Sequence, residues 1–124
     1  RSGKTKGVIQ AAVGPINGLA FGSKRVAVAG DYLAVRQPGS STFTRFTGHN
    51  GNVLCAAFSP DGRLLASGGV DRMVRVWSTE DATEIAAYVG HTNSVLAVAF
   101  APSGKALYST GQEGSLRRWA VPVV

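Results

Sequence analysis

The distribution of apolar and polar positions predicts a chain of short β-strands separated by turns. Val53–Phe58 and Val95–Phe100 are almost continuously apolar, which is typical of strands covered on both faces. Val74–Trp77 alternates apolar and charged side chains, so it predicts a strand with two different faces. Pro and Gly fall together at Ser59–Gly62 and Ala101–Gly104, where tight turns are expected. The pattern therefore predicts an all-β fold.

These elements recur at a spacing of 42 residues. Residues 48–78 align with residues 90–120 without a gap, and 13 of the 31 aligned positions are identical. Each copy opens with Gly-His, at His49 and His91, and has a Trp near its end, at Trp77 and Trp119. This period and these residues resemble the WD-repeat β-propeller family. The resemblance implies blades of four antiparallel strands, about three of them in this chain, as part of a propeller.

The resemblance divides the chain into five expected segments. Residues 1–7 are a flexible basic terminus, 8–13 an outer strand of a neighbouring or last blade, 14–47 a degenerate blade, 48–89 a WD-type blade, and 90–124 a WD-type blade without its own outer strand. In the degenerate blade the predicted strands are Ile16–Phe21, Arg25–Ala29, Tyr32–Arg36 and Thr42–Phe46. Gly14-Pro15 stands there where the other blades have Gly-His, and nothing matches the Trp, so the assignment depends on strand order.

The family resemblance assigns a structural role to a polar and aromatic set that occurs twice. Within one blade, the expected hydrogen-bond network runs from an acidic side chain to His, from His to Ser, and from Ser to the Trp indole. Such a closed network satisfies its buried polar groups together. Its members are His49, Ser67, Asp71 and Trp77 in one copy and His91, Ser109, Glu113 and Trp119 in the other. Glu113 is one methylene longer than Asp, so its network is expected to be strained or water-bridged.

The same residue types could instead form a nucleophilic triad of His49, Ser67 and Asp71. A catalytic site rarely occurs in tandem copies, whereas a structural network repeats with its blade. The sequence has two His, one Cys and no clustered carboxylates, so it lacks metal-ligand spacing. We therefore expect a non-enzymatic chain without cofactor or metal.

Other proteins are the expected partners, bound through loops at one end of the blades. In the family, partners usually contact the loops that enter the innermost strand and the loops between the second and third strands. The corresponding positions are Asn50, Asn52, Thr92 and Asn93 in the first set and Val70, Arg72 and Gln112 in the second. Loops often carry function, although solvated loop residues without a role are common.

Residues 1–48 carry the whole net charge of +6, because they contain seven basic side chains and one acidic side chain, Asp31. Nucleic-acid or polyanion binding is therefore an alternative function, with Lys24, Arg25 and Arg36 as its candidate surface. These residues are scattered between apolar strands, and a solvated surface is the simpler interpretation. A further alternative is an excised or engineered propeller fragment that only folds and assembles.

Three blades are too few for a ring, since known propellers use about four to eight. The outer faces of the end blades, with Val26, Val28, Leu107 and Leu116, would then be open to water and are expected to associate. Further copies of the chain, or the missing blades of a larger propeller, would complete the ring. In the first case residues 8–13 of one copy would add beside residues 116–119 of another.

The sequence also bears on where the chain resides. No apolar run approaches the about 18 residues that cross a bilayer, and we expect no membrane partner. The single Cys55 lies within an apolar strand and is expected to be buried, which favours a reducing compartment. A soluble, cytoplasmic protein is the expectation.

Overall fold

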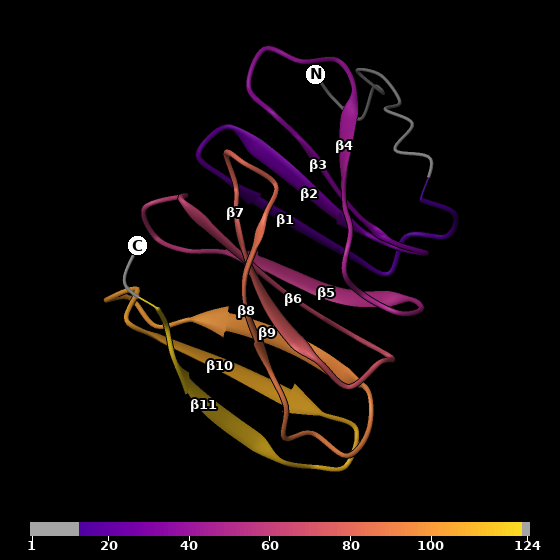
Figure 1. Cartoon of the computed structure of the whole chain (residues 1–124), viewed down its shortest axis with the longest axis vertical. Helices are drawn as coiled ribbons and strands as arrows, with labels where there is room; N and C mark the ends of the chain where they lie inside the picture. Colours follow the sequence, from indigo (N-terminus) through magenta and orange to yellow (C-terminus); the bar gives the residue numbers. More distant parts are fainter. Residues whose placement is uncertain (1–12, 123–124) are drawn as a thin grey trace, which may run out of the picture.

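A computed structural model describes residues 13–122, and these residues form three antiparallel sheets without helices (Figure 1). Sheet 1 consists of β1 (Gly18–Gly22), β2 (Arg25–Ala29), β3 (Leu33–Arg36) and β4 (Phe43–Phe46). Sheet 2 consists of β5 (Val53–Phe58), β6 (Leu64–Gly69), β7 (Val74–Ser78) and β8 (Glu84–Tyr88). Sheet 3 consists of β9 (Val95–Phe100), β10 (Ala106–Gly111) and β11 (Leu116–Ala120). The predicted all-β fold of four-stranded blades is confirmed, with one strand fewer in sheet 3.

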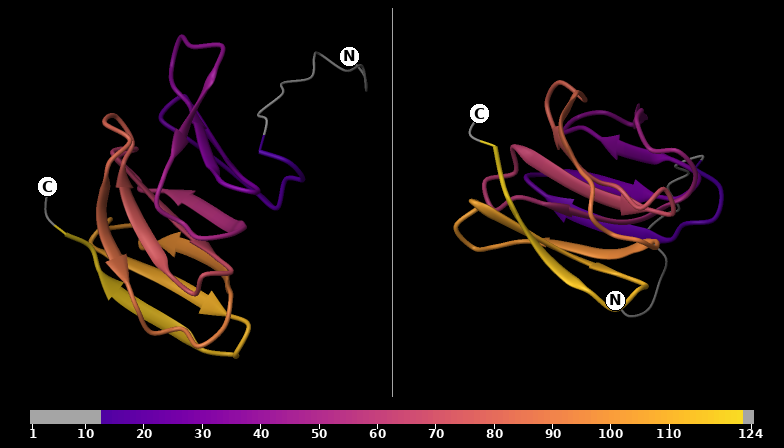
Figure 2. Two further views of the ribbon diagram at one scale, coloured as in Figure 1. Left: turned by 45° about the vertical axis from the view of Figure 1, so that its right-hand side comes forward. Right: turned by 60° about the horizontal axis from the view of Figure 1, so that its bottom comes forward.

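The sheets are stacked in chain order along the long axis of the molecule (Figures 1 and 2). Within each sheet, neighbouring strands are joined by turns and paired in sequence order. The first strands of the sheets lie side by side, because β5 contacts both β1 and β9. Sheet 2 therefore has a neighbour on each face, whereas sheets 1 and 3 each have one within the described residues.

The core consists of two apolar layers between the sheets. The layer between sheets 1 and 2 contains Ala27, Leu33, Val35, Phe46, Leu65 and Trp77. The layer between sheets 2 and 3 contains Cys55, Ala66, Val74, Val76, Val95 and Leu107. Burial raises the pKa of the Cys55 thiol to about 12, so this Cys is a neutral packing residue.

Close packing of sheets 2 and 3 depends on glycine at residue 68. A Cβ at Gly68 would lie 2.4 Å from Cγ1 of Val95, so β6 and β9 approach each other only because this position has no side chain.

Because the sheets are stacked, the apolar strands β5 and β9 have different environments. β5 is covered from both sides, whereas Leu96, Ala97 and Ala99 of β9 are exposed on the face that no described sheet covers.

Sheet 1 differs from prediction at its beginning. β1 starts at Gly18, and Ile16 precedes it as an exposed residue. Of the expected strand at residues 8–13, the structure describes Val13 alone. Val13 is in a bend, its carbonyl accepts a hydrogen bond from the Asp31 N–H (2.6 Å), and its side chain is buried against Val28. Residues 8–12 and the expected flexible segment 1–7 lie outside the described part.

The predicted composition of the exposed end faces is partly wrong. Leu107 is fully buried, because the register of β10 directs it toward sheet 2. Val28 is buried beneath Val13. Val26 is half-buried and Leu116 is exposed, in agreement with expectation. Over residues 13–122 the fold offers no helix of the length and apolarity needed to cross a membrane.

Candidate functional site

The polar network of sheet 2 joins four residues that are distant in sequence. Trp77 Nε1–H donates to Ser67 Oγ at 2.8 Å, and Ser67 Oγ lies 2.6 Å from His49 Nε2. His49 Nδ1 lies 3.1 Å from Asp71 Oδ2. Ser67 is on β6, Trp77 is on β7, and the other two residues precede β5 and β7. The network thus ties two strands and two loops of one sheet together.

The donors and acceptors of this network form one consistent chain. The Ser67 oxygen accepts from the indole, so its own proton is free to point to His49 Nε2, and His49 Nδ1–H then donates to Asp71. This assignment requires a neutral imidazole. Burial lowers the pKa of His49, against the opposing field of Asp71, and so favours that neutral form.

Asp71 accepts hydrogen bonds from the backbone as well as from His49. The N–H groups of Asn50 and Met73 donate to its carboxylate at 3.0 and 3.2 Å. Burial alone would raise the pKa of Asp71, but the hydrogen bonds that its carboxylate accepts, first that of the Asn50 N–H, outweigh it, and the pKa is lowered overall. Asp71 is therefore an ionised anchor for the two loops at this end of sheet 2.

The network of sheet 3 has the same order but a different acidic end. Trp119 Nε1–H donates to Ser109 Oγ at 2.8 Å, and Ser109 Oγ lies 2.7 Å from His91 Nε2. Glu113 Oε2 lies 2.5 Å from His91 Nδ1 and also accepts from the Ser115 hydroxyl. These two hydrogen bonds, first that of Ser115, lower the pKa of Glu113 to about 2. The longer side chain thus takes a hydroxyl donor where Asp71 takes backbone N–H groups.

Each Trp also contacts an aromatic residue from the last strand of the preceding sheet. Trp77 lies 5.6 Å from Phe46 of β4, and Trp119 stacks on Tyr88 of β8 with ring centroids 5.0 Å apart. The Tyr88 hydroxyl also donates to the Ala120 carbonyl at 2.7 Å. Sequence reasoning missed these contacts, although Phe46 and Tyr88 are themselves 42 residues apart.

The geometry does not favour a nucleophilic role for the serines. Ser67 and Ser109 are fully buried, so a substrate cannot approach either hydroxyl. Each oxygen also accepts an indole hydrogen bond, which reduces its nucleophilicity. Within residues 13–122, no three side chains of the metal-binding types cluster.

The structure brings the expected partner-binding loop residues to one end of sheets 2 and 3. The two loop sets of each sheet are joined by a backbone hydrogen bond, from Val70 N–H to Asn52 O at 3.0 Å and from Gln112 N–H to Ser94 O at 2.9 Å. The exposed side chains of this surface are Asn50, Asn52, Val70, Arg72, Thr92, Asn93 and Gln112. We call this set the loop surface.

The three basic residues proposed for polyanion binding do not form one surface. The β2–β3 register puts Arg36 opposite Val26, so it lies on the outer face of sheet 1, where it lines a depression of about 450 Å³ with Lys24. Arg25 is one residue earlier on β2, so its side chain points to the opposite face. There Arg25 Nε donates to Gln37 Oε1 at 2.5 Å.

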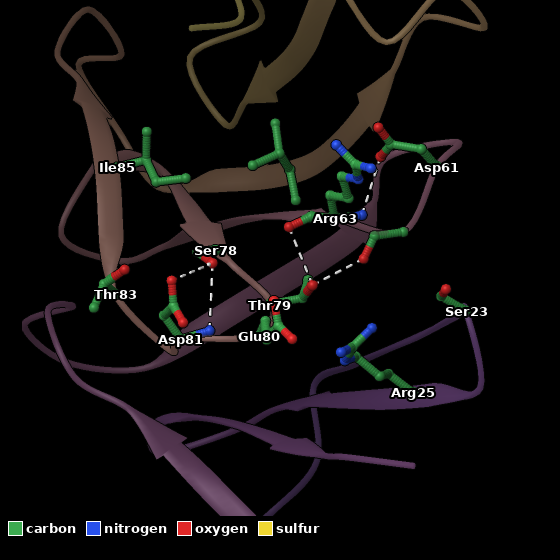
Figure 3. Close-up of a pocket in the computed structure, with 12 residues that line it drawn as sticks. Ser23, Arg25, Asp61, Arg63, Ser78, Thr79, Glu80, Asp81, Thr83 and Ile85 are labelled. Atoms are coloured by element: carbon green, nitrogen blue, oxygen red, sulfur yellow. Dashed lines mark hydrogen bonds between the residues drawn. The ribbon is translucent and has the colours of Figure 1, made fainter. Parts of the chain in front are cut away.

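Arg25 lines a second pocket, which sequence reasoning did not find. This pocket of about 650 Å³ lies between sheets 1 and 2, at the end opposite to the loop surface (Figure 3). Figure 3 shows Arg25 extending from sheet 1 toward the segment of sheet 2 that carries Thr79 and Glu80. Three carboxylates share its wall with two guanidinium groups: Asp61, Glu80, Asp81, Arg25 and Arg63. Its mixed charges argue against a polyanion site.

Comparison with known proteins places this geometry in a family. The WD40 family (WD domain, G-beta repeat) matches residues 39–78 and 82–120, which together exceed half of the chain. WD repeat-containing protein 1 of Bos taurus is 36% identical over 89 residues, covering 63% of this chain and 14% of that protein. Transcription initiation factor TFIID subunit 5 of Caenorhabditis elegans is 50% identical over 50 residues, covering 40% of this chain and 8% of that protein.

Protein HIR1 of Yarrowia lipolytica is 46% identical over 48 residues, covering 39% of this chain and 4% of that protein. The chain thus spans a small part of each of these relatives. The matched residues include both polar networks and all strands of sheets 2 and 3. The chain belongs to the WD40 family, and its three sheets are blades of a β-propeller.

Proposed function

We propose that this chain is a non-enzymatic WD40 module whose two end sheets pack against further propeller blades and whose loop surface binds other proteins. WD repeat proteins in general mediate protein–protein interaction and assembly. Other copies of this chain are the first candidates for the additional blades, and the missing blades of a larger propeller are the second.

The observation that carries this proposal is the exposure of apolar side chains on both end faces. Leu19 and Phe21 on the outer face of sheet 1 are 69% and 76% exposed, and Leu116 on the outer face of sheet 3 is 67% exposed. Val74, the equivalent of Leu116 in sheet 2, is fully buried because sheet 3 covers it. A further blade would cover Leu116 in the same way, and exposed apolar patches favour such association.

The loop surface supports the second part of the proposal. Its side chains are exposed, while the backbone beneath them is fixed by hydrogen bonds to the network and between loops. A rigid support with exposed polar side chains loses little entropy when a partner binds. The buried serines support the absence of enzymatic activity, since the triad-like residues are used inside the blades.

Polyanion binding is less well supported by the structure than by the sequence. Arg25 lies with Asp61, Glu80 and Asp81, which would repel a phosphate. Lys24 and Arg36 remain together on the outer face of sheet 1, a face that the proposed assembly covers. We therefore expect generic duplex DNA to bind weakly, with an affinity that falls as the salt concentration rises.

The test is the mass of the 124-residue chain in solution over a range of concentrations, with an apolar dye as a probe of exposed patches. Assembly into closed multimers that bind little dye supports copies of the chain as the added blades. A monomer that binds dye strongly supports blades from other sequence. A stable monomer that binds no dye would refute the proposal.

A further inference from the structure

The asparagines of this chain differ in how freely the next backbone nitrogen can reach their side-chain amide. They are Asn17, Asn50, Asn52 and Asn93. Asparagine is thermolabile because that nitrogen can attack its Cγ and close a five-membered ring. A following glycine leaves the nitrogen unshielded by a side chain, and two of the four asparagines precede a glycine, at Gly18 and Gly51.

The Asn50–Gly51 pair is open to this reaction. Both residues are exposed in the loop that enters β5. The Asn50 backbone N–H donates to Asp71 at 3.0 Å, but neither the Asn50 side-chain amide nor the Gly51 N–H has a hydrogen-bond partner among residues 13–122. Gly51 has a φ of +97°, and a Cβ there would lie 2.8 Å from Cγ2 of Val70. The loop thus requires a glycine at the position that makes Asn50 reactive.

The Asn17–Gly18 pair has the same sequence but is held in place. The Asn17 side-chain amide donates to the Val53 carbonyl at 3.2 Å, and its backbone N–H donates to the Ala29 carbonyl at 2.8 Å. Gly18 is the first residue of β1 and is paired with Ala29. A Cβ on Gly18 would lie 2.9 Å from the Leu54 carbonyl oxygen, so little space remains beside it. Ring closure here requires this end of β1 to open first.

The other two asparagines are protected by the residue that follows. Val53, after Asn52, is buried and β-branched, and its N–H donates to the Gly30 carbonyl at 2.8 Å. The Ser94 N–H donates to Oδ1 of the preceding Asn93 at 2.7 Å, so its proton faces the side chain that its nitrogen would attack. Asn50 is therefore the asparagine at which the folded chain leaves both reacting groups free.

We propose that Asn50 is a deamidation site on the loop surface, and that folding directs the reaction to it in preference to Asn17. The Gly51 nitrogen loses its proton to solvent base and bonds to Asn50 Cγ, and the Cγ–Nδ2 bond breaks with release of ammonia. Water then opens the succinimide ring. Cleavage of the bond from the nitrogen to Cγ gives aspartate, whereas cleavage of the bond to the backbone carbonyl carbon gives isoaspartate. Water is the only co-reactant, and the inference goes beyond the proposed function.

The two products change the loop surface in different ways. Both replace a neutral amide with a carboxylate. Isoaspartate also inserts one carbon into the main chain, between the Asn50 N–H that Asp71 holds and the N–H of Val53, which begins β5. The insertion displaces Asn52, whose carbonyl accepts the Val70 N–H at 3.0 Å. Isoaspartate therefore weakens the hydrogen bond that joins the two loop sets of sheet 2.

The test incubates the purified 124-residue chain at neutral pH and follows each asparagine by peptide mapping and mass spectrometry. We expect Asn50 to convert about tenfold faster than Asn17, because attack at Asn17 must first break its hydrogen bonds. In urea, where the chain is unfolded, the two Asn–Gly pairs should react at similar rates. Asn50→Gln should remove the fast conversion and leave the rate at Asn17 unchanged.

Amide hydrogen exchange distinguishes the effects of the two products. The Val70 N–H of the separated isoaspartate form should exchange about fivefold faster than in the unreacted chain, as the loss of one hydrogen bond predicts. Asn50→Asp is the matched control, because it adds the charge without lengthening the main chain. Exchange at Val70 should be unchanged in that variant.

Equal rates at the two Asn–Gly pairs of the folded chain, or a faster rate at Asn17, would overturn the proposal. An intact Asn50 after a time in which the unfolded chain has reacted would also overturn it. Unchanged Val70 exchange in the isoaspartate form would overturn the stated effect on the loop surface. The mass and dye measurement does not depend on these results, so the proposed assembly through the end faces can stand or fall separately.

Discussion

Sheets 2 and 3 carry the same motif 42 residues apart, yet their shared residues are in different surroundings. Trp77 is fully buried and Trp119 half-buried, and Val74 is buried where Leu116 is exposed. The difference arises from the neighbours, because within residues 13–122 sheet 2 lies between two sheets and sheet 3 has one. A repeat of this kind obtains much of its stability from the repeat beside it, so its sequence alone does not set its burial.

The acidic ends of the two networks also differ, in the hydrogen bonds that they accept. Asp71 fixes two loops through the backbone N–H groups of Asn50 and Met73. Glu113 is instead held by a side-chain hydroxyl and is more exposed. Sheet 2 thus has a network that connects loops, whereas the acid of sheet 3 mainly orients its own His91.

The largest expected difference between the sheets is in their tryptophans. Trp77→Ala should reduce the free energy of unfolding by about 3–5 kcal/mol, because it removes the largest buried side chain and the indole donor to Ser67. Trp119→Ala should cost less, because that ring is already partly exposed. Urea unfolding followed by circular dichroism measures both, and equal losses would contradict the account of unequal burial.

Substitution of the two acidic residues should give a smaller difference in stability between the sheets. Asp71→Asn should cost about 1–3 kcal/mol, because it leaves backbone donors and His49 with a weaker acceptor. Glu113→Gln should have a smaller effect, since fewer buried donors depend on it. Thermal unfolding of the two variants beside the wild type gives the comparison, and a larger loss for Glu113→Gln would reverse it.

Acidification should weaken the sheet 2 network through His49. The pKa of His49 in the folded chain is lowered below the ordinary 6.5, so the unfolded chain takes up this proton first. The stabilisation is complete above pH 6.5 and is lost as pH falls toward the folded pKa. The slope of unfolding free energy between pH 7.5 and 5.5 should therefore be positive, and His49→Asn should make it shallower. An unchanged slope in that variant would assign the effect elsewhere.

The smallest expected difference concerns one turn position. Arg72 has a φ of +69°, and the equivalent residue of sheet 3, Gly114, has a φ of +95°. Gly114→Ala should cost about 1 kcal/mol, because a Cβ is unfavourable in this conformation. Arg72→Gly should change stability by only a few tenths of a kcal/mol, since relief of strain is offset by a more flexible unfolded chain. Chemical unfolding midpoints distinguish the two.

The strands of sheets 2 and 3 could be predicted because each is an apolar run bounded by Pro and Gly. The composition of the polar networks followed from the family resemblance. Sequence could not place Leu107 and Val28, because which face a residue occupies depends on register and on the sheet that covers it. For the same reason, Arg25 and Arg36 were grouped although they lie on opposite faces of sheet 1.

Contacts between elements were also beyond the sequence pattern. The stacking of Trp119 on Tyr88 and the pair of Arg75 with Glu84 require the three-dimensional order of the strands. Both involve β8, the outer strand of sheet 2. The repeat did hold a clue to the Arg75 contact, since the arginine occurs in both copies, at Arg75 and Arg117.

The central claim is that the two end faces are complementary docking surfaces, and a complementation experiment tests it most directly. Phe21→Glu places a charge on the outer face of sheet 1, and Leu116→Glu places one on the outer face of sheet 3. Each variant alone should remain monomeric in sedimentation, because a head-to-tail contact needs both faces. A mixture of the two should form a one-to-one complex through the two intact faces. Variants that stay monomeric when mixed would contradict the claim that copies of this chain supply the added blades.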